Sequence, residues 1–574
     1  MKKFIKKSCN KTWSSTSRRQ FFLKRTMKII KRHMDSFILL VAVSIINYVV
    51  LLYIIQSEIL MYWYDVYSYT FQAYKCMLKG QYSNPLVGLP FIVIYCIFLR
   101  IAINLGISHL VAARIFSLVI ETGLLLILYH LLKMVLRNTL ESFIIILALK
   151  FDYIIFMFSN VPYRENFSLL FFLIYIYGML IYIREHSKKH LIIGSLCLIV
   201  SILTRPEVFL LFMSPIIFLN LYTLLRKKGL PSLTYVIFII SIIMPYLLLY
   251  LYDMFSPVKT KLTMFLFRKF EYIINEKSLF HYINQLNYRV LSLNINFEYI
   301  LFILTFIAWI TTILRKPEQD ILMLLVFYIN TQIFSVILYT SIPTSLNTKF
   351  ILSPGIAPRY KIIPRYLTYI TLGMVTCKFI NTLYEKSIKR YIDNISLILI
   401  ISNYRFKIKT AYMVKFITCC LFLGLLINNV VIPETKLAFS SMRFISETKI
   451  RPFYDAVMFI SSNISNKTKV IAFSATMLVA IKPEIEEKLI DTKIFFNQYI
   501  GSSKILMKSL TDDEKISIIS KIIEKIENDR SIKYIIVVRD NVFFKSIKDK
   551  WYIIESKLKL IKDLGLVKIY VRQD

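Results

Sequence analysis

The sequence predicts a polytopic α-helical membrane protein of about 11 transmembrane helices, followed by a small C-terminal extracytoplasmic α/β domain. Of its 574 residues, 56% are hydrophobic and only 19% are charged, and the mean hydropathy is +0.59. Soluble domains carry about 25% charged residues. Apolar runs recur at the length of roughly 20 residues that crosses a ~30 Å hydrocarbon core, and they stop at Pro433.

The net charge of +37 indicates basic cytoplasmic loops and anionic lipid headgroups as partners, and not nucleic acid. The same charge suits a substrate that carries phosphate. The 7 cysteines are scattered, so neither a disulfide framework nor a metal site is predicted.

Residues 1–34 form a basic cytosolic N-terminal segment that contains no acidic residue. The apolar run that follows is too long for the core of a signal peptide. It predicts a retained first helix and a cytosolic N-terminus.

Residues 35–433 form the predicted transmembrane domain, whose first outer loop is 57–107. The stretch 91–105 is predicted to be a re-entrant or interfacial helix, because a span there would turn the later basic loops outward. Spans are expected near 36–56, 108–132, 141–159, 165–183, 190–204, 207–225, 232–252, 298–314, 320–341, 366–384 and 412–432.

Residues 434–574 form the predicted C-terminal α/β domain, which an odd number of spans places outside the cell. Buried strands are expected at 470–475 and 534–538, and a final strand at 566–573. An amphipathic helix is expected over 511–529, opened by Thr511.

Asp65, in the stretch MYWYDVYSY, follows the first span directly and lies among aromatic residues. A carboxylate in this half-dry layer can have a raised pKa and accept a proton, so Asp65 is a candidate general base. The alternative is a helix N-cap at the Tyr67–Ser68 turn, and the spacing leaves the two roles equally open.

Charged residues at two further places are expected at the outer ends of spans, where their cost implies a function. Arg164 and Glu165 begin one span in the stretch VPYRENFSLLFF. Arg205 and Glu207 flank a proline and divide an apolar run too long for one span, which predicts an outer hairpin. A capped helix and a plain turn are the structural alternatives, and the charges favour a role in binding substrate.

The segment SPGIAPRYKIIPRYLTYI repeats Pro-Arg-Tyr before a late span. Arg359, Tyr360 and Arg365 are candidates for binding a lipid phosphate, since guanidinium groups offer paired donors to phosphoryl oxygens. Simple headgroup anchoring is the alternative. No Walker loop, dinucleotide fingerprint or zinc motif is present in the sequence.

Taken in order, these motifs resemble the GT-C superfamily of polytopic glycosyltransferases, in particular the prokaryotic relatives of protein O-mannosyltransferases and aminoarabinose transferases. The likeness covers Asp65, the arginine-containing second span, the YRENFSLLFF segment, the TRPE hairpin, the late PRY segment and a C-terminal domain.

The resemblance implies an inverting transferase in the cell membrane that moves a sugar from a polyprenyl-phosphate donor to an acceptor on the extracytoplasmic side. Asp65 would be the base, and Arg359, Arg365 and Arg205 would hold the departing phosphate. The acceptor would be a lipid, a glycan or a protein. No cofactor is expected. Tyr64 and Val66 flank Asp65, so no acidic pair for a metal is predicted there, and a divalent metal ion stays an open alternative.

Two other classes fit the same composition. One is a transporter or flippase of lipid-linked saccharides, and the other is a non-catalytic membrane scaffold. Transporters usually carry internal repeats and polar groups near the middle of the membrane. The sequence shows no repeat and places its ionisable groups at span ends, which favours the enzyme.

Overall fold

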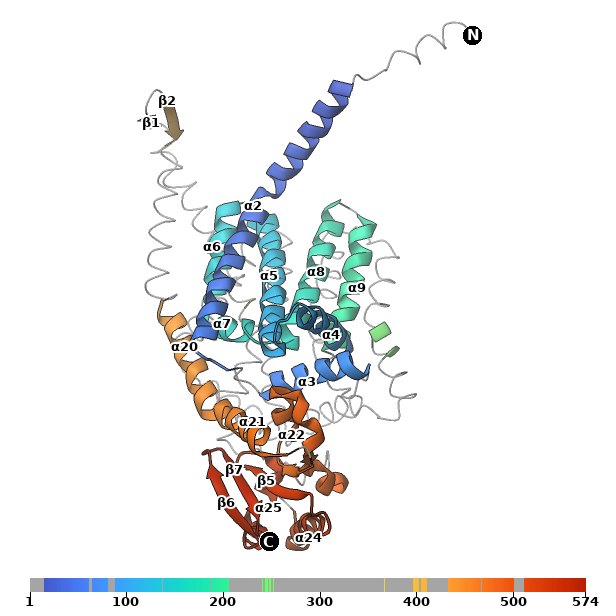
Figure 1. Cartoon of the computed structure of the whole chain (residues 1–574). Coiled ribbons are helices and arrows are strands. Elements are labelled where there is room, and N and C mark those ends of the chain that lie inside the picture. Colours follow the sequence, from blue (N-terminus) through green and yellow to red (C-terminus); the bar gives the residue numbers. More distant parts are fainter. Residues whose placement is uncertain are drawn as a thin grey trace, which may run out of the picture.

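The structure is a computed structural model in which a bundle of helices stands on a small sheet domain (Figure 1). It describes residues 15–60, 64–80, 88–136, 138–185, 187–205, 396–401, 404–409, 432–465, 467–499 and 510–573, with short pieces at 240, 243–245, 247–248, 251 and 366.

The described elements of the bundle are α2 (Ser15–Gln56), α3 (Tyr64–Lys79), α4 (Leu89–Asn104), α5 (His109–Leu136), α6 (Thr139–Lys150), α7 (Tyr153–Ser159), α8 (Arg164–Glu185) and α9 (Lys188–Thr204). A separate antiparallel pair, β1 (Ser396–Ile401) and β2 (Tyr404–Lys409), lies in a stretch where the sequence predicted only a basic turn.

Three of the described helices contain a segment long and apolar enough to cross a membrane, namely Met34–Gln56, His109–Leu136 and Arg164–Tyr182. They match the first, second and fourth predicted spans. The predicted short fifth span is α9. The predicted spans from 207 to 432 lie wholly or mostly outside the described residues, so the count of about 11 stays a prediction.

The prediction of one continuous span over 141–159 is wrong. The chain forms α6, which ends at Lys150, and the short α7, which begins at Tyr153. At 1.5 Å per residue, α6 is only about 18 Å long and does not cross a bilayer. The side chain of Asp152, expected at the outer end of a span, instead accepts a hydrogen bond from the backbone N–H of Ile155 (3.1 Å) and caps α7.

The α4 helix crosses the upright helices instead of running beside them (Figure 1). Pro90 occupies its first turn, where a missing N–H costs nothing. Its start is packed tightly on the end of α9, because a Cβ on Gly88 would lie 2.3 Å from the Thr204 carbonyl oxygen. This placement agrees with the predicted interfacial helix.

Helices α8 and α9 form a tightly packed hairpin. A Cβ on Gly178 would lie 2.6 Å from the His190 carbonyl oxygen, and one on Gly194 would lie 3.3 Å from the carbonyl oxygen of Tyr175. Small residues at such positions let two backbones approach closely, which is how helices pack in lipid. The start of α8 and the end of α9 are therefore held beside one another.

The C-terminal part contains a five-stranded sheet with strand order β4-β3-β5-β7-β6. Strands β3, β4 and β5 are parallel, whereas β7 is antiparallel to both β5 and β6. Gly565, with φ +77°, allows the turn between β6 and β7. The strands are β3 (Lys469–Ala472), β4 (Leu489–Asp491), β5 (Ile532–Val538), β6 (Leu558–Asp563) and β7 (Val567–Arg572).

The predicted amphipathic helix is present as α24 (Asp512–Asn528), and Thr511 and Glu514 form a capping box at its start. Its buried face carries Ile518 and Ile522 at helical spacing. The remaining helical elements are α20 (Ile432–Ile445), η4 (Ser446–Ile450), α21 (Arg451–Asn463), α22 (Ala475–Ile481), η5 (Pro483–Lys488), η6 (Thr492–Tyr499), α25 (Val542–Ile547), η7 (Lys548–Lys550) and α26 (Tyr552–Glu555).

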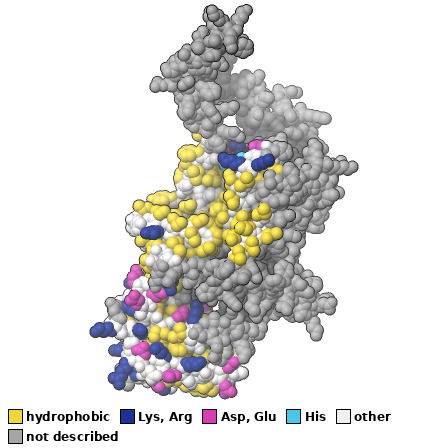
Figure 2. Space-filling model, turned by 90° about the vertical axis from the view of Figure 1, so that its right-hand side faces the viewer, with side chains coloured by type: hydrophobic (Ala, Val, Ile, Leu, Met, Phe, Trp, Pro, Cys, Tyr) yellow, Lys and Arg dark blue, Asp and Glu magenta, His cyan; other side chains and the backbone are white. Residues whose placement is uncertain are grey.

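The surface changes character between the two parts. Apolar side chains form a band over the bundle, whereas Lys, Arg, Asp and Glu are mixed over the C-terminal domain (Figure 2). Exposed residues on α2 such as Ile45 and Tyr48 (58% and 62% exposed) belong to such a lipid-facing surface. The boundary proposed at 434 falls inside α20, which packs on α7 and continues through η4 into α21.

Candidate functional site

The candidate site lies at the end of the bundle that faces the sheet, which we call the sheet end. The start of α5 at His109, the start of α8 at Arg164 and the end of α9 at Arg205 all lie there. His109 marks the level, because its Nε2 lies 3.1 Å from the carbonyl oxygen of Ala480 in α22.

Glu165 and Arg205 form a buried ion pair at the sheet end. The Oε1 of Glu165 lies 2.5 Å from Nη1 of Arg205, and the two side chains are only 1% and 4% exposed. The tight α8–α9 hairpin brings them together although 40 positions separate them in the chain. Removing one partner of such a pair leaves an uncompensated charge in a low-dielectric interior, so the pair fixes the guanidinium in place.

Asp65 is the second residue of α3. Tyr69, one helical turn after Asp65 on α3, contacts the ring of Tyr163 with centroids 6.2 Å apart. Tyr163 directly precedes Arg164 and Glu165 in the chain. Helix α3 and the segment that precedes α8 therefore touch one helical turn after Asp65.

Of the predicted site residues, the structure brings together Glu165 and Arg205, and Arg164 directly precedes Glu165 in the chain. The position of Asp65 beside this pair stays a prediction. Arg164 is half-buried at the start of α8. Glu207, Arg359, Tyr360 and Arg365 lie outside the described residues.

The C-terminal domain packs against the same helix α3. Lys75 forms an ion pair with Glu486 at 2.6 Å, and the ring of Tyr74 lies 5.9 Å from that of His109. Burial, with the nearby charge of Glu484, raises the pKa of Tyr74 above its ordinary value. Helix α3 thus packs between α4 and α22. These contacts hold its first turn in position.

A second buried ion pair lies deeper in the bundle, and the sequence analysis did not predict it. The Nζ of Lys150 lies 2.5 Å from Oε2 of Glu121, and both side chains are fully buried. Glu121 is about 18 Å along α5 from His109, near the middle of the helix. This pair is an exception to the expectation that ionisable groups cluster at the outer ends of spans, and it weakens one argument against a transporter.

Tyr366, the residue after Arg365, lies near this deeper pair. Its ring is fully buried, and its phenol is within electrostatic range of Glu121 and Asp152. The second Pro-Arg-Tyr motif therefore ends inside the bundle, against the junction of α6 and α7. Glu121 and Lys150 each lie inside an apolar run of the sequence, and this pattern could have indicated the buried cluster.

A metal site is not evident in the part of the chain that the structure describes. Within it, no three His, Cys, Asp or Glu side chains lie close enough together to hold a metal ion. The arrangement offers a fixed guanidinium and a helix start that carries a carboxylate residue, which is chemistry for acid–base work and for stabilising an anion.

No protein-family model matches the sequence, and no curated protein matches it. Solved structures do match its fold. ArnT from Cupriavidus metallidurans, bound to undecaprenyl phosphate, superposes with a TM-score of 0.53 and 12% identity, over 92% of this chain and 97% of ArnT.

The oligosaccharyltransferase of Archaeoglobus fulgidus in its apo form superposes with a TM-score of 0.52 and 10% identity, over 88% of this chain and 70% of that enzyme. The same enzyme in complex with zinc and sulfate gives a TM-score of 0.51. Both neighbours are polytopic membrane glycosyltransferases of the GT-C superfamily. This chain therefore shares the fold of these enzymes, as the resemblance in its ordered motifs implied.

Proposed function

We propose that the protein is a membrane glycosyltransferase that takes its sugar from a polyprenyl-phosphate donor. The observation that carries the proposal is the buried Glu165–Arg205 pair within a fold shared with ArnT. The neighbour ArnT is bound to undecaprenyl phosphate, which supports a lipid phosphate as the carrier of the donor sugar.

In the proposed reaction, Asp65 accepts the proton of the acceptor nucleophile. The nucleophile attacks the anomeric carbon, the bond from that carbon to the phosphate oxygen breaks, and the lipid phosphate leaves with the electron pair. Direct attack inverts the sugar. A departing phosphate gains negative charge, so cationic groups that are already in place lower the barrier.

Arg205 supplies one such group, and Glu165 holds it in position. Arg359 and Arg365, with Tyr360, are the further proposed contacts to the phosphate. Arg164 and Glu207 are proposed to complete the charged rim.

The proposed topology places the N-terminus in the cytosol and the sheet domain outside the cell. The proposed domains are 1–34, 35–433 and 434–574.

The acceptor is proposed to be a lipid, a glycan or a protein. Mass spectrometry of surface glycans and glycolipids from cells with and without the protein would identify the class of the acceptor. A divalent metal is compatible with the reaction and is tested by adding a chelator to the transfer assay.

The substitution Asp65→Asn tests the base. We expect at least a ~100-fold loss of turnover with unchanged donor binding, since general base catalysis contributes typically 10²–10⁴-fold. The assay is release of polyprenyl phosphate from a panel of polyprenyl-phosphate sugars by the purified protein. Glu58→Gln is the matched control, because Glu58 is a 75% exposed carboxylate at the same end of the bundle.

Full transfer by the Asp65→Asn variant would refute the assignment of the base. If neither the wild-type protein nor the variant releases polyprenyl phosphate, and both move a lipid-linked saccharide across vesicles, the protein is a transporter and not an enzyme.

A further inference from the structure

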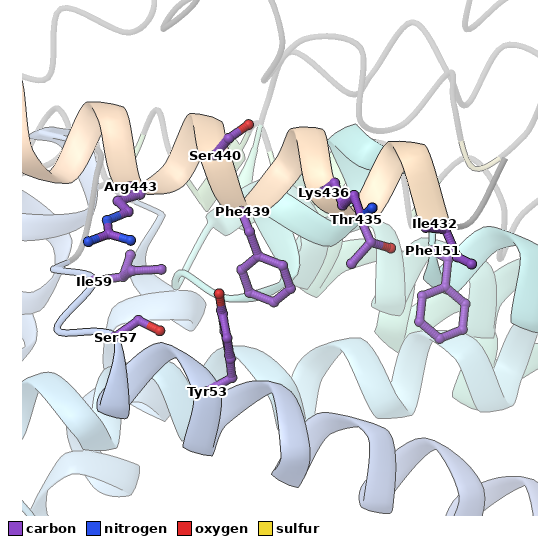
Figure 3. Close-up of a pocket in the computed structure, with 10 residues that line it drawn as sticks. All are labelled: Tyr53, Ser57, Ile59, Phe151, Ile432, Thr435, Lys436, Phe439, Ser440 and Arg443. Carbon is purple, nitrogen blue, oxygen red and sulfur yellow. The ribbon is translucent and has the colours of Figure 1, made fainter. Parts of the chain in front are cut away.

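A groove of about 540 Å³ lies on the outside of the bundle, between the end of α2, the junction of α6 and α7, and the helix α20 (Figure 3). It is separate from the candidate site. The Glu165–Arg205 pair lies between α8 and α9, whereas α20 lies across the bundle from those helices (Figure 1).

One part of the groove is apolar. The rings of Tyr53 on α2 and Phe439 on α20 meet edge to face with centroids 4.5 Å apart, and Phe151 and Ile432 lie farther along. Tyr53 is 48% exposed and Ile432 is 43% exposed. They continue the lipid-facing side of α2, so the groove opens toward the hydrocarbon of the bilayer.

The helix α20 adds positive charge to the same face. Lys436 and Arg443 lie on either side of Phe439 at helical spacing, and both line the groove. Arg443 also pairs with the exposed Glu447 at 2.9 Å, so its charge is shared.

A hydrogen-bonding group also faces the groove. The Oγ1 of Thr435 is buried, and it has no hydrogen-bond partner among the described residues. A buried hydroxyl without a partner costs free energy, so a ligand atom that satisfies it is favoured.

The positions of these groups along the groove correspond to different depths in a bilayer. Phe151 lies at its inner end, between the buried residues Lys150 and Asp152 in the chain. Arg443 and Ser57 lie at the other end, just past Gln56, where the apolar segment of α2 stops. Arg443 thus lies where headgroups are found, Lys436 and Thr435 lie deeper than Phe439, and Ile432 and Phe151 lie where acyl chains are found (Figure 3).

We propose that this groove binds an anionic phospholipid of the surrounding bilayer. Its phosphate lies between Arg443 and Lys436, and its acyl chain continues along Ile432 and Phe151. The Thr435 hydroxyl donates a hydrogen bond to a headgroup or ester oxygen. The second source of the same chemistry is the polyprenyl phosphate carrier, and a bilayer lipid is favoured because the groove lies away from the Glu165–Arg205 pair.

The test uses the full chain in phosphatidylcholine nanodiscs that contain a phosphatidylglycerol with a photoreactive diazirine in its acyl chain. After illumination, digestion and mass spectrometry, we expect labelled peptides that contain Phe151 and Ile432. The double variant Lys436→Gln and Arg443→Gln should label about tenfold less, since each cation near an anionic headgroup contributes about a factor of five and Arg443 is partly neutralised.

Two further variants separate the groove from general effects. Thr435→Val removes the buried hydroxyl without changing the charge of the groove and should also reduce the labelling. Lys449→Gln removes an exposed cation that pairs with Asp540, outside the groove, and should label like the wild type.

Equal labelling in the wild type and the groove variants would overturn the proposal. Loss of the labelling on addition of polyprenyl phosphate, but not on addition of unlabelled phosphatidylglycerol, would also overturn it in favour of the carrier lipid. Neither result depends on whether the protein transfers a sugar.

Discussion

The fully buried Glu121–Lys150 pair allows a quantitative test of the interior of the bundle. Its atoms are 2.5 Å apart, and neither side chain is exposed. With charge centres about 4 Å apart and an effective dielectric constant of 20, the attraction is about 4 kcal/mol. Removing either charge loses this attraction and leaves the other charge buried, so Glu121→Gln or Lys150→Met should each cost about 3–5 kcal/mol in the free energy of unfolding.

The double variant removes both charges, and no buried ion is left without a partner. It should therefore cost no more than about 2 kcal/mol, less than either single variant. The free energies are measured by SDS titration in mixed micelles, followed by far-UV circular dichroism. Asp549→Asn is the control, because it breaks a surface pair with Lys515 and should cost about 1 kcal/mol or less.

If the two single costs simply add in the double variant, the residues do not interact and the argument from burial fails. Single costs as small as that of the control would show instead that water reaches the pair. A double variant as stable as the wild type would agree with the reasoning, since well-packed apolar residues often replace buried ion pairs without loss.

Two further predictions concern the C-terminal domain and α4. Burial of Asp540 raises its pKa, but the hydrogen bonds and charges of Lys545 and Lys449 outweigh burial and hold the pKa below its usual value. The unfolded chain then binds the proton more readily, so this stabilisation is complete above pH ~4 and is lost as the pH falls further. Acid unfolding followed by tryptophan fluorescence should show wild type and Asp540→Asn converging at low pH. Separately, Gly88→Ala places a Cβ against the Thr204 carbonyl and should cost about 1–3 kcal/mol or more, measured by SDS titration.

The controls for these two are available in the same chain. Asp455→Asn changes a carboxylate on α21 and should leave the acid unfolding unaltered. Gly123→Ala adds a methyl group that meets only the flexible end of Leu170, at 3.6 Å, and should be tolerated. Parallel acid curves for wild type and the Asp540 variant, or a neutral Gly88→Ala, would contradict the respective argument.

Local sequence patterns predicted the elements whose stability is local. A continuous apolar run in lipid has to form a helix, because its backbone groups find no other hydrogen-bond partners. The spans Met34–Gln56 and His109–Leu136 followed from this rule. The helix α24 followed from its spacing and from the capping residue Thr511.

What the sequence did not predict depends on contacts between distant positions. The stretch 141–159 is apolar enough for one span, and only the pairing of Lys150 with Glu121 indicates why the chain turns there. The Glu165–Arg205 contact needs the packing of a whole hairpin, which no local pattern encodes. The sequence pointed to charged residues at the sheet end, but it could not assign their partners.

The close packing at Gly178 and Gly194 has a consequence for how this protein could be altered. Because the two helix backbones touch, α8 and α9 can neither slide nor rotate past each other without a steric clash. The start of α8 and the end of α9 are then fixed relative to one another before any substrate binds. If the whole hairpin is grafted into a related protein, the start of α8 and the end of α9 should keep their relative position. Either helix grafted alone should not keep it.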